Sequence, residues 1–264
     1  MKKIFVFLLF LALAFSVFFF PRSGFSQELK PSYVTLVIPL RGREYWQDFV
    51  RVKDLLEMLK RKKLPVTILL QYQSLTDQEV TGYLKSLPEN FELGLFLEVD
   101  QTLASNSLVS YLYGIGDRAH ANQVLLSGYD IVYRKRMIDE IFSLFVKTMG
   151  ILPRSVGVWY MDAVSQNYLK EKYAINIVLD VADQYQTDTY GLWGKPWGVP
   201  FIPSKFNPLV PFQNKRDNSG LVKIQWAARD PVKGYGLTVK DSTYSVQAND
   251  YIKGHGFDIN YFAH

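Results

Sequence analysis

Two carboxylic acids, Glu98 and Asp100, stand two residues apart near the end of an apolar stretch. In an extended strand, side chains at this spacing point to the same side, and paired carboxylates can act as acid and base in glycoside hydrolysis. The structural alternative is that Asp100 caps the segment after it, while Glu98 pairs with Arg41 or Arg43. We place this alternative first, because same-side acids near strand ends are common and no second motif fixes the geometry.

Two arginines follow the first apolar stretch directly, in the order Arg41-Gly42-Arg43-Glu44. Guanidinium groups at this position could clamp an anionic or polyhydroxyl ligand through bidentate hydrogen bonds. The alternative is that both arginines neutralise neighbouring acids. The sequence favours neither reading, because both place Arg41 and Arg43 at the same end of the strand.

The segment from residue 182 to residue 219 is rich in Pro, Gly, Trp and Tyr and lacks helical periodicity. Aromatic planes can stack on sugar rings, while acids and amides bond hydroxyl groups, so this segment is suited to a glycan-binding groove. A long loop held in place by its own aromatic side chains is the alternative, and both can hold together. We expect substrate contacts from Gln184, Asp188, Trp193 and Trp197, and a catalytic carboxyl from Asp183 to work with Glu98.

The elements that must position these residues alternate between strands and helices. Short apolar or β-branched stretches predict strands, at residues 33–40, 65–70, 91–99, 155–161, 175–181 and 221–227. Apolar residues at helical spacing predict helices at residues 46–63, 76–87, 127–149 and 165–173. This alternation indicates β-α units in a parallel sheet or barrel, whose active groups lie at the carboxyl ends of the strands.

Local signals predict where several of these helices begin and end. Thr76 and Glu79 form a capping-box pattern, and Ser127 is the expected cap of the long helix. Gly150 should end that helix, and the basic run at residues 60–63 should end the first one, because cations oppose the helix dipole there. Asp162 is expected to be a loop or cap residue beside the helix that follows it.

Several segments match, in order and spacing, a known pattern of strands. Residues 34–42 (VTLVIPLRG) and 65–70 (PVTILL) fit a first and a second strand, and residues 154–159 and 175–180 fit a later pair. Residues 92–100 (ELGLFLEVD) fit a strand that would normally be Glu-Ile-Gly-x-His-x-x-x-His. Over residues 32–182 the chain thus resembles the polysaccharide deacetylase-like (NodB-type) family of the glycoside hydrolase/deacetylase superfamily. This resemblance implies an α/β fold, a distorted seven-stranded (β/α) barrel.

The metal-binding motifs of that family are missing here. The family holds a metal with an Asp and two His, but this chain has Leu40-Arg41 at the acidic positions, Phe96 at the first His and Asp100 at the second. A zinc site needs three or four converging N, O or S ligands. The resemblance therefore transfers no metal and no other cofactor to this chain.

We expect a carbohydrate-active protein whose partner is a polysaccharide or oligosaccharide. One reading is a metal-independent glycoside hydrolase-like or divergent deacetylase-like enzyme, with Glu98, Asp100 and Asp183 as catalytic residues and Arg41 and Arg43 among the substrate contacts. The alternative is a non-catalytic glycan-binding pseudoenzyme of the cell envelope. A structural envelope protein without a ligand is the third reading.

Composition narrows the function classes further. The 264 residues include 30 Lys and Arg, 25 Asp and Glu, and no cysteine. The absence of cysteine excludes disulfides, Cys-ligated metal sites and thiol catalysis. The small, scattered basic excess gives no support to nucleic-acid binding, and removal of residues 1–26, which hold three bases and no acids, would reduce the net charge to +2.

The N-terminal residues 1–26 have the layout of a secretory signal peptide: Lys2 and Lys3, then an apolar run to Phe20, then Gly24 and Ser26 before a cleavage point. An uncleaved anchor is the alternative, and it would be the chain's membrane contact. We expect export to a bacterial cell envelope, periplasmic or extracellular. We expect the barrel over residues 32–230 and a turn-rich tail over residues 231–264. The 264 residues are either a complete minimal domain or the front part of a longer protein, and the sequence leaves both alternatives open.

Overall fold

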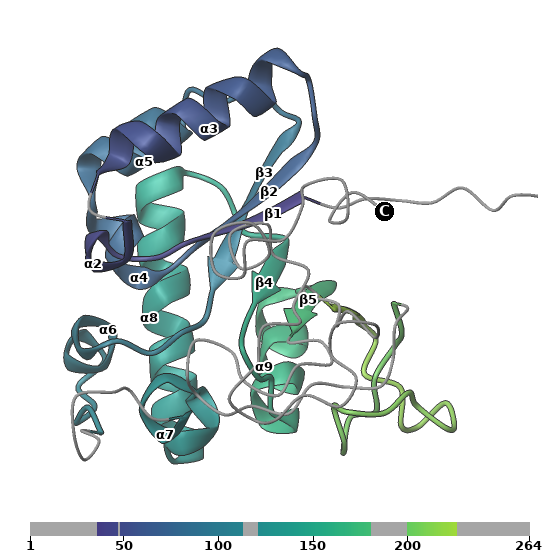
Figure 1. Ribbon diagram of the computed structural model, residues 1–264. Coiled ribbons are helices and arrows are strands. Elements are labelled where there is room, and N and C mark those ends of the chain that lie inside the picture. Colours follow the sequence, from purple (N-terminus) through teal and green to yellow (C-terminus); the bar gives the residue numbers. More distant parts are fainter. Residues whose placement is uncertain (1–35, 47, 113–120, 181–199, 226–264) are drawn as a thin grey trace, which may run out of the picture. The chain divides into compact units, whose positions relative to one another are not determined.

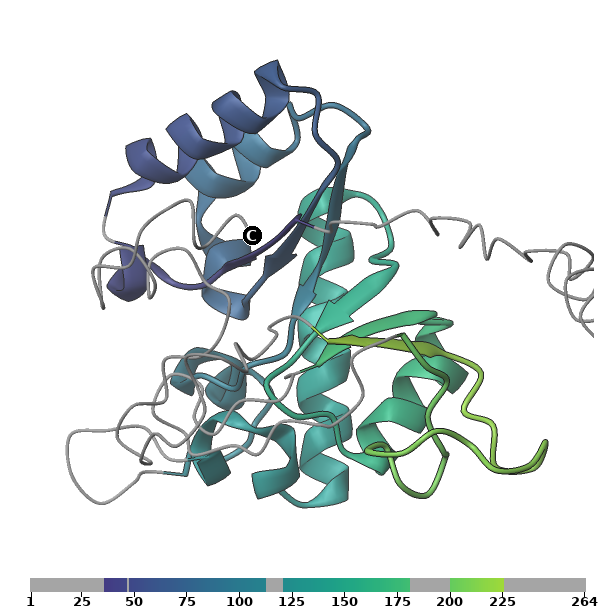
Figure 2. The same cartoon turned by 45° about the vertical axis from the view of Figure 1, so that its right-hand side comes forward.

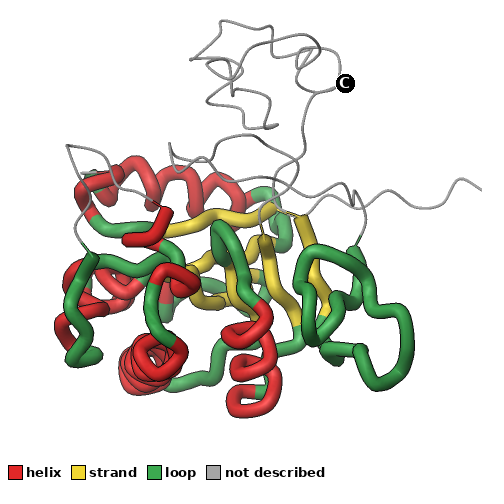
Figure 3. The backbone as a smooth tube through the Cα atoms, turned by 90° about the horizontal axis from the view of Figure 1, so that it is seen from below, coloured by secondary structure: helices red, strands yellow, loops and turns green. Residues whose placement is uncertain are grey.

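The computed structural model describes residues 36–46, 48–112, 121–180 and 200–225. These residues form one sheet of six parallel strands in the order β1-β2-β3-β4-β5-β6. The sheet is curled like half of a barrel, which Figure 3 shows from below. The predicted α/β class and barrel-like arrangement are thus confirmed, although the described residues form six strands rather than the predicted seven.

Strands and helices alternate along the chain, as the sequence predicts (Figure 1). The first half contains β1 (Leu36–Leu40), α2 (Arg43–Trp46), α3 (Phe49–Arg61), β2 (Val66–Leu70), α4 (Tyr72–Thr76), α5 (Gln78–Leu84), β3 (Phe91–Phe96) and α6 (Gln101–Asn106). The second half contains α7 (Ala121–Val124), the 3-10 turn η1 (Leu126–Gly128), α8 (Ile131–Met149), β4 (Ser155–Gly157), α9 (Ala163–Tyr173), β5 (Ile177–Asp180) and β6 (Val222–Gln225).

Two predicted helix caps are wrong, and in each case a nearby aspartate stands at the N-cap position, although the side chain makes capping hydrogen bonds only at Asp77. Asp77 caps α5 by accepting hydrogen bonds from the backbone N–H groups of Glu79 and Val80, whereas Thr76 is the last residue of α4. Asp130 occupies the N-cap position of α8, and Ser127 lies in η1. The predicted end of α8 is confirmed, because Gly150 adopts φ +75°, a left-handed conformation that glycine tolerates best.

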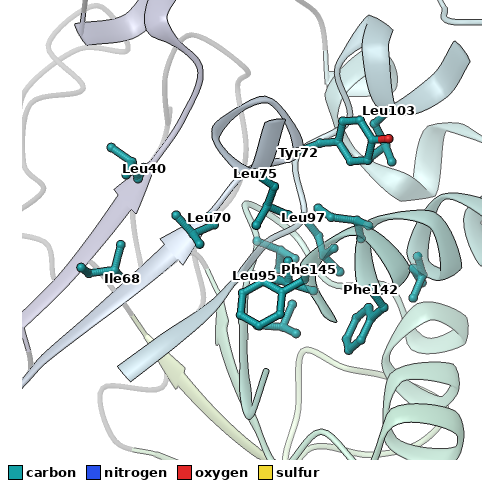
Figure 4. Close-up of a cluster of buried hydrophobic side chains, with 14 of the residues drawn as sticks. Leu40, Ile68, Leu70, Tyr72, Leu75, Leu95, Leu97, Leu103, Phe142 and Phe145 are labelled. Atoms are coloured by element: carbon teal, nitrogen blue, oxygen red, sulfur yellow. The ribbon is translucent and has the colours of Figure 1, made fainter. Parts of the chain in front are cut away.

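Alternate residues along the strands belong to two separate hydrophobic clusters, because successive side chains in a strand point to opposite faces of the sheet. Ile68 and Leu70 belong to the larger cluster, which also contains buried residues of α3, α5, α8 and α9. The close-up in Figure 4 shows part of it, with Leu40 and Leu70 from the strands and Phe142 and Phe145 from α8.

Helices α3, α5, α8 and α9 therefore cover one face of the sheet. Figure 2 shows α3 and α5 beside the first strands and α9 beside the later ones. The smaller cluster, on the opposite face, contains Leu69, Phe96, Trp159 and Leu179. Within the described ranges, no helix is long and apolar enough to cross a membrane.

Candidate functional site

The candidate site lies at the carboxyl edge of β1, β2 and β3. All strands are parallel, and the register pairs Leu40 with Leu70, so the next residues, Arg41 and Gln71, stand at the same level. Glu98 follows β3 by two residues. Arg41, Gln71 and Glu98 thus come together at one end of the sheet, where β/α folds carry their functional side chains.

Arg41 and Glu98 form a buried ion pair. The Arg41 Nη2 lies 2.5 Å from Glu98 Oε1, and the two side chains are 11% and 1% exposed. The guanidinium carbon lies 3.4 Å from the ring centroid of Tyr45 and 5.6 Å from that of Trp159, so cation–π contacts also hold it. A buried carboxylate needs such a partner, and this pairing is the arrangement that the structural alternative for Glu98 predicts.

Three side chains fix the backbone that carries Arg41. Ser74 donates its hydroxyl to the carbonyl oxygens of Leu40 and Arg41, the latter at 2.8 Å. The indole N–H of Trp46 donates to the same Arg41 oxygen at 2.7 Å. The buried Gln71 accepts the N–H of Gly42 at 2.9 Å. The turn after β1 is therefore held by Trp46 of α2, by Gln71 directly after β2, and by Ser74 of α4.

Arg43 is directed towards the N-terminus of α5. Its Nε and Nη2 bond Asp77 at 2.5 and 3.1 Å, and its Nη2 also bonds Glu79 at 2.5 Å. The Arg43 guanidinium holds the pKa of Asp77 below its ordinary value. Arg43 therefore neutralises acids of α5, as the second reading of the two arginines predicts.

Asp100 combines a structural role with a perturbed carboxyl group. It caps α6 by accepting the N–H of Leu103 at Oδ1, at 2.7 Å, while Oδ2 is buried and has no hydrogen-bond partner among the described residues. Burial raises the pKa of Asp100 to about 6, the charges of Glu44 and Glu98 add to this, and backbone hydrogen bonds at Leu103 and Thr102 oppose it. A carboxyl with this pKa can give or take a proton near neutral pH.

A pocket of about 460 Å³ opens beside these residues. Its lining is mostly polar, with one large aromatic side chain, and includes Glu44, Trp46, Gln73, Thr76, Asp77 and Thr102. Hydroxyl, amide and carboxylate groups next to an aromatic plane can bind a polyhydroxyl ligand such as a sugar.

The metal that the resemblance would imply does not fit the residues at this edge. At the acidic position, Arg41 presents a guanidinium, which has no lone pair to donate. Phe96, at the first His position, is fully buried and packs edge-on against Trp159 with ring centroids 5.3 Å apart. Of the three positions, Asp100 alone has a donor oxygen, and no group of three or more His, Cys, Asp or Glu in the described residues could hold a metal ion.

Other candidate residues lie elsewhere. Asp162 caps α9 by accepting the N–H of Ser165 at 3.0 Å, and it pairs with Arg134 at 3.0 Å. Asp180 and Lys223 form an ion pair at 2.8 Å in which both side chains are 1% exposed, so they join β5 to β6. Outside the described residues lie Asp183, Gln184, Asp188, Trp193 and Trp197.

Sequence reasoning missed several residues of the site, chiefly Gln71, Gln73, Ser74 and Trp159. The signal for Gln71 was present, because it directly follows a predicted strand and the strand-end rule selects it. No comparable signal existed for Ser74, because its hydroxyl reaches back to the end of β1 from a helix 34 residues later.

Comparisons with solved structures show the fold. A candidate glycoside hydrolase/deacetylase from Parabacteroides distasonis matches with a TM-score of 0.54 and 19% identity, over 75% of this chain and 46% of that one. A candidate polysaccharide deacetylase from Mycobacterium smegmatis matches with a TM-score of 0.41 and 11% identity, over 75% of this chain and 60% of that one. This chain thus spans about half the length of the solved structures it matches.

The first of these matches confirms the predicted deacetylase-like resemblance at the level of the fold. A search of curated proteins found no match to the chain. The model of a family described as a domain of unknown function with a solved structure, DUF3863, matches residues 111–253, more than half of the chain. The chain therefore belongs to the DUF3863 family.

Proposed function

We propose that this protein is a carbohydrate-active protein that binds a glycan over the carboxyl edge of β1–β3, with Asp100 as its acid–base group. The observation that carries the proposal is the buried carboxyl of Asp100, whose pKa is raised to about 6 beside a polar pocket that contains Trp46. The similarity in fold to a candidate glycoside hydrolase/deacetylase supports a carbohydrate as the ligand.

Within this proposal, Glu98 and Arg41 support Asp100. Glu98 is 1% exposed and is bonded to Arg41, so its carboxylate is better placed to set the local charge than to meet a substrate. Asp183 remains the proposed second carboxyl, and Gln184, Asp188, Trp193 and Trp197 the proposed sugar contacts. Two carboxyls of a glycosidase act as proton donor and as base or nucleophile, depending on their separation.

A non-catalytic glycan-binding protein is the second candidate. It is favoured by the engagement of Glu98 with Arg41, which leaves Asp100 as the carboxyl of the two that forms no ion pair among the described residues. Both candidates predict sugar binding at the same place, and they differ in turnover.

Turnover and binding can be measured on the same samples. The full chain and Asp100→Asn are incubated with a panel of oligosaccharides, with assays for new reducing ends and for released acetate, and retention on glycan gels is measured in parallel. The enzyme reading expects release by the wild type and at least about a hundredfold loss in Asp100→Asn. Retention without release would support the binding protein, and neither retention nor release would refute the proposal.

We also propose that residues 1–26 direct the protein to the cell envelope. The support is their sequence pattern of two lysines followed by an apolar run. Fractionation of a bacterium that expresses the full chain, with sequencing of the N-terminus of the product, tests this. Recovery in the cytoplasmic fraction with an intact N-terminus would contradict it.

A further inference from the structure

A loop of residues 200–221 leads into β6 and stands out beside α9, drawn in yellow-green in Figure 2. Hydrogen bonds inside the loop fix its backbone. The N–H of Lys205 donates to the carbonyl oxygen of Asp217 at 2.8 Å. The hydroxyl of Ser204 donates to the carboxylate of Asp217 and accepts the N–H of Phe206 at 3.0 Å. Side chains of α9 also donate to two carbonyl groups of the loop, so the loop is held against the fold at several points.

Phe206 exposes its ring to solvent from this loop. The residue is 80% exposed, whereas every other phenylalanine and tryptophan that the structure describes is buried or only partly exposed. Leu209, in the same loop, is 37% exposed. Single exposed apolar residues are common on protein surfaces, so what this ring can bind depends on the groups around it.

The same loop carries cations that no carboxylate neutralises. Lys205, Lys215 and Arg216 form no ion pair within the described residues, and residues 200–216 contain no Asp or Glu. Asp217 follows directly, but it is buried, and its carboxylate accepts two hydrogen bonds from the loop itself. The solvent side of the loop is therefore positively charged.

The pairing of the two arms of the loop brings the ring and the charges together. Ser204 forms an antiparallel bridge with Asn218. In an antiparallel pair, residues at equal distances from a bridge lie opposite each other. Phe206 and Arg216 each lie two residues from the bridge, on the side of the turn, so they stand at the same level of the loop. The loop thus presents an apolar ring with cations beside it.

We propose that this loop binds the surface of an anionic phospholipid bilayer. Phe206 would enter the boundary between headgroups and acyl chains, while Lys215 and Arg216 would lie among the lipid phosphates. Binding at such an interface grows with the apolar area that is buried and with the attraction between cations and anionic lipids. An anionic glycan would also attract the cations, but it offers no apolar layer in which Phe206 and Leu209 could be buried. This membrane contact goes beyond the proposed function and does not depend on it.

A probe placed in the loop tests the proposal on the full chain. The chain has no cysteine, so Phe206→Cys provides a single thiol for an apolar fluorophore whose emission rises and shifts to the blue outside water. The labelled protein is titrated at low salt with vesicles of equal parts phosphatidylglycerol and phosphatidylcholine, and with vesicles of phosphatidylcholine alone. A local probe is needed because residues 1–26 could bring the chain to a bilayer without the loop. We expect the emission to change with the anionic vesicles and little with the neutral ones.

Charge and position have separate controls. Replacing Lys215 and Arg216 together by Gln in the labelled protein should raise the concentration of anionic vesicles needed for half of the emission change at least about tenfold. Val50→Cys with the same label is the matched control, because Val50 is a 58% exposed apolar residue of α3, and its emission should not change.

Four results would overturn the proposal. They are an unchanged emission with anionic vesicles, an equal change with neutral vesicles, an equal change at the α3 control position, and an unaltered titration after the loss of the two cations. Alginate, an acidic polysaccharide, is added in place of vesicles in a parallel titration. A change with alginate but not with vesicles would also overturn the proposal, and would identify an acidic glycan as the partner of the loop.

Discussion

Replacing Asp100 by Asn should stabilise the protein above neutral pH and leave its stability nearly unchanged in acid. Burial raises the pKa of Asp100 to about 6, whereas an aspartate in an unfolded chain has a pKa of about 3.9. The folded state thus binds this proton more tightly than the unfolded state does. Between about pH 4 and pH 6, the contribution of Asp100 to stability must therefore fall as the pH rises.

The size of the effect follows from this difference in pKa. About 2 pH units correspond to about 3 kcal/mol, at 1.36 kcal/mol for each unit. Asparagine can still cap α6, because its side-chain oxygen can accept the N–H of Leu103. Its amide N–H₂ needs a partner in turn, which costs part of the gain, so we expect a stabilisation of about 1–3 kcal/mol at about pH 8.

Urea denaturation followed by tryptophan fluorescence, at several pH values between about 4 and 8, measures this change in the free energy of unfolding. The two proteins should agree near about pH 4 and separate as the pH rises through 6. A constant difference at every pH, or a destabilisation that grows with pH, would show that the Asp100 carboxyl is not disfavoured by burial and would refute the reasoning.

Three further substitutions and one control variant test the surroundings of the site. Asp77→Asn should show the opposite pH dependence, because Arg43 lowers the pKa of Asp77. At neutral pH we expect the free energy of unfolding to fall by about 0.5–1 kcal/mol, a small value because the ion pair is partly exposed. The same measurement below about pH 4 should show no loss. Ser74→Ala removes two buried hydrogen bonds to the turn after β1 and should cost about 1–3 kcal/mol by denaturation; an unchanged midpoint would contradict this. Gly94→Ala would bring a methyl group to 2.6 Å from the carbonyl oxygen of Ser155 and should cost about 1–3 kcal/mol in thermal unfolding. Gly82→Ala, in α5 with open space around it, should be neutral or stabilising, and an equal loss in both variants would refute a steric cause.

Much of the fold could be predicted because its signals are local. Each described strand lies inside a predicted apolar stretch, and the stripe Ile138, Ile141, Phe142, Phe145 and Met149 of α8 is fully or almost fully buried as its spacing indicates. The strands came out shorter than their apolar stretches, because the chain beyond Phe96 or Gly157 stays buried after it leaves the sheet. Burial sets the length of an apolar stretch, whereas pairing sets the length of a strand.

The sequence could predict where the site lies in the fold, but not which of its side chains form ion pairs and hydrogen bonds with each other. The strand-end rule selected Arg41, Glu98 and Asp100, and the structure brings them to one edge of the sheet. Which arginine would meet which acid could not be read from the sequence, because Arg41 and Glu98 are separated by 57 residues. The fixing of the Arg41 backbone by Ser74 depends on the same long-range packing, which no local pattern encodes.

The packing of Phe96 limits how this protein could acquire new chemistry. Its ring is fully buried in the small cluster with Leu69, Trp159 and Leu179. A histidine at this position would place a polar ring nitrogen in apolar surroundings, which costs free energy unless a hydrogen bond or a metal satisfies it. Arg41 would still occupy the acidic position at the end of β1, two strands away in the sheet. A single substitution of Phe96 by His should therefore lower the stability of the protein without completing a metal site, because the same ring that fills this position also packs the core.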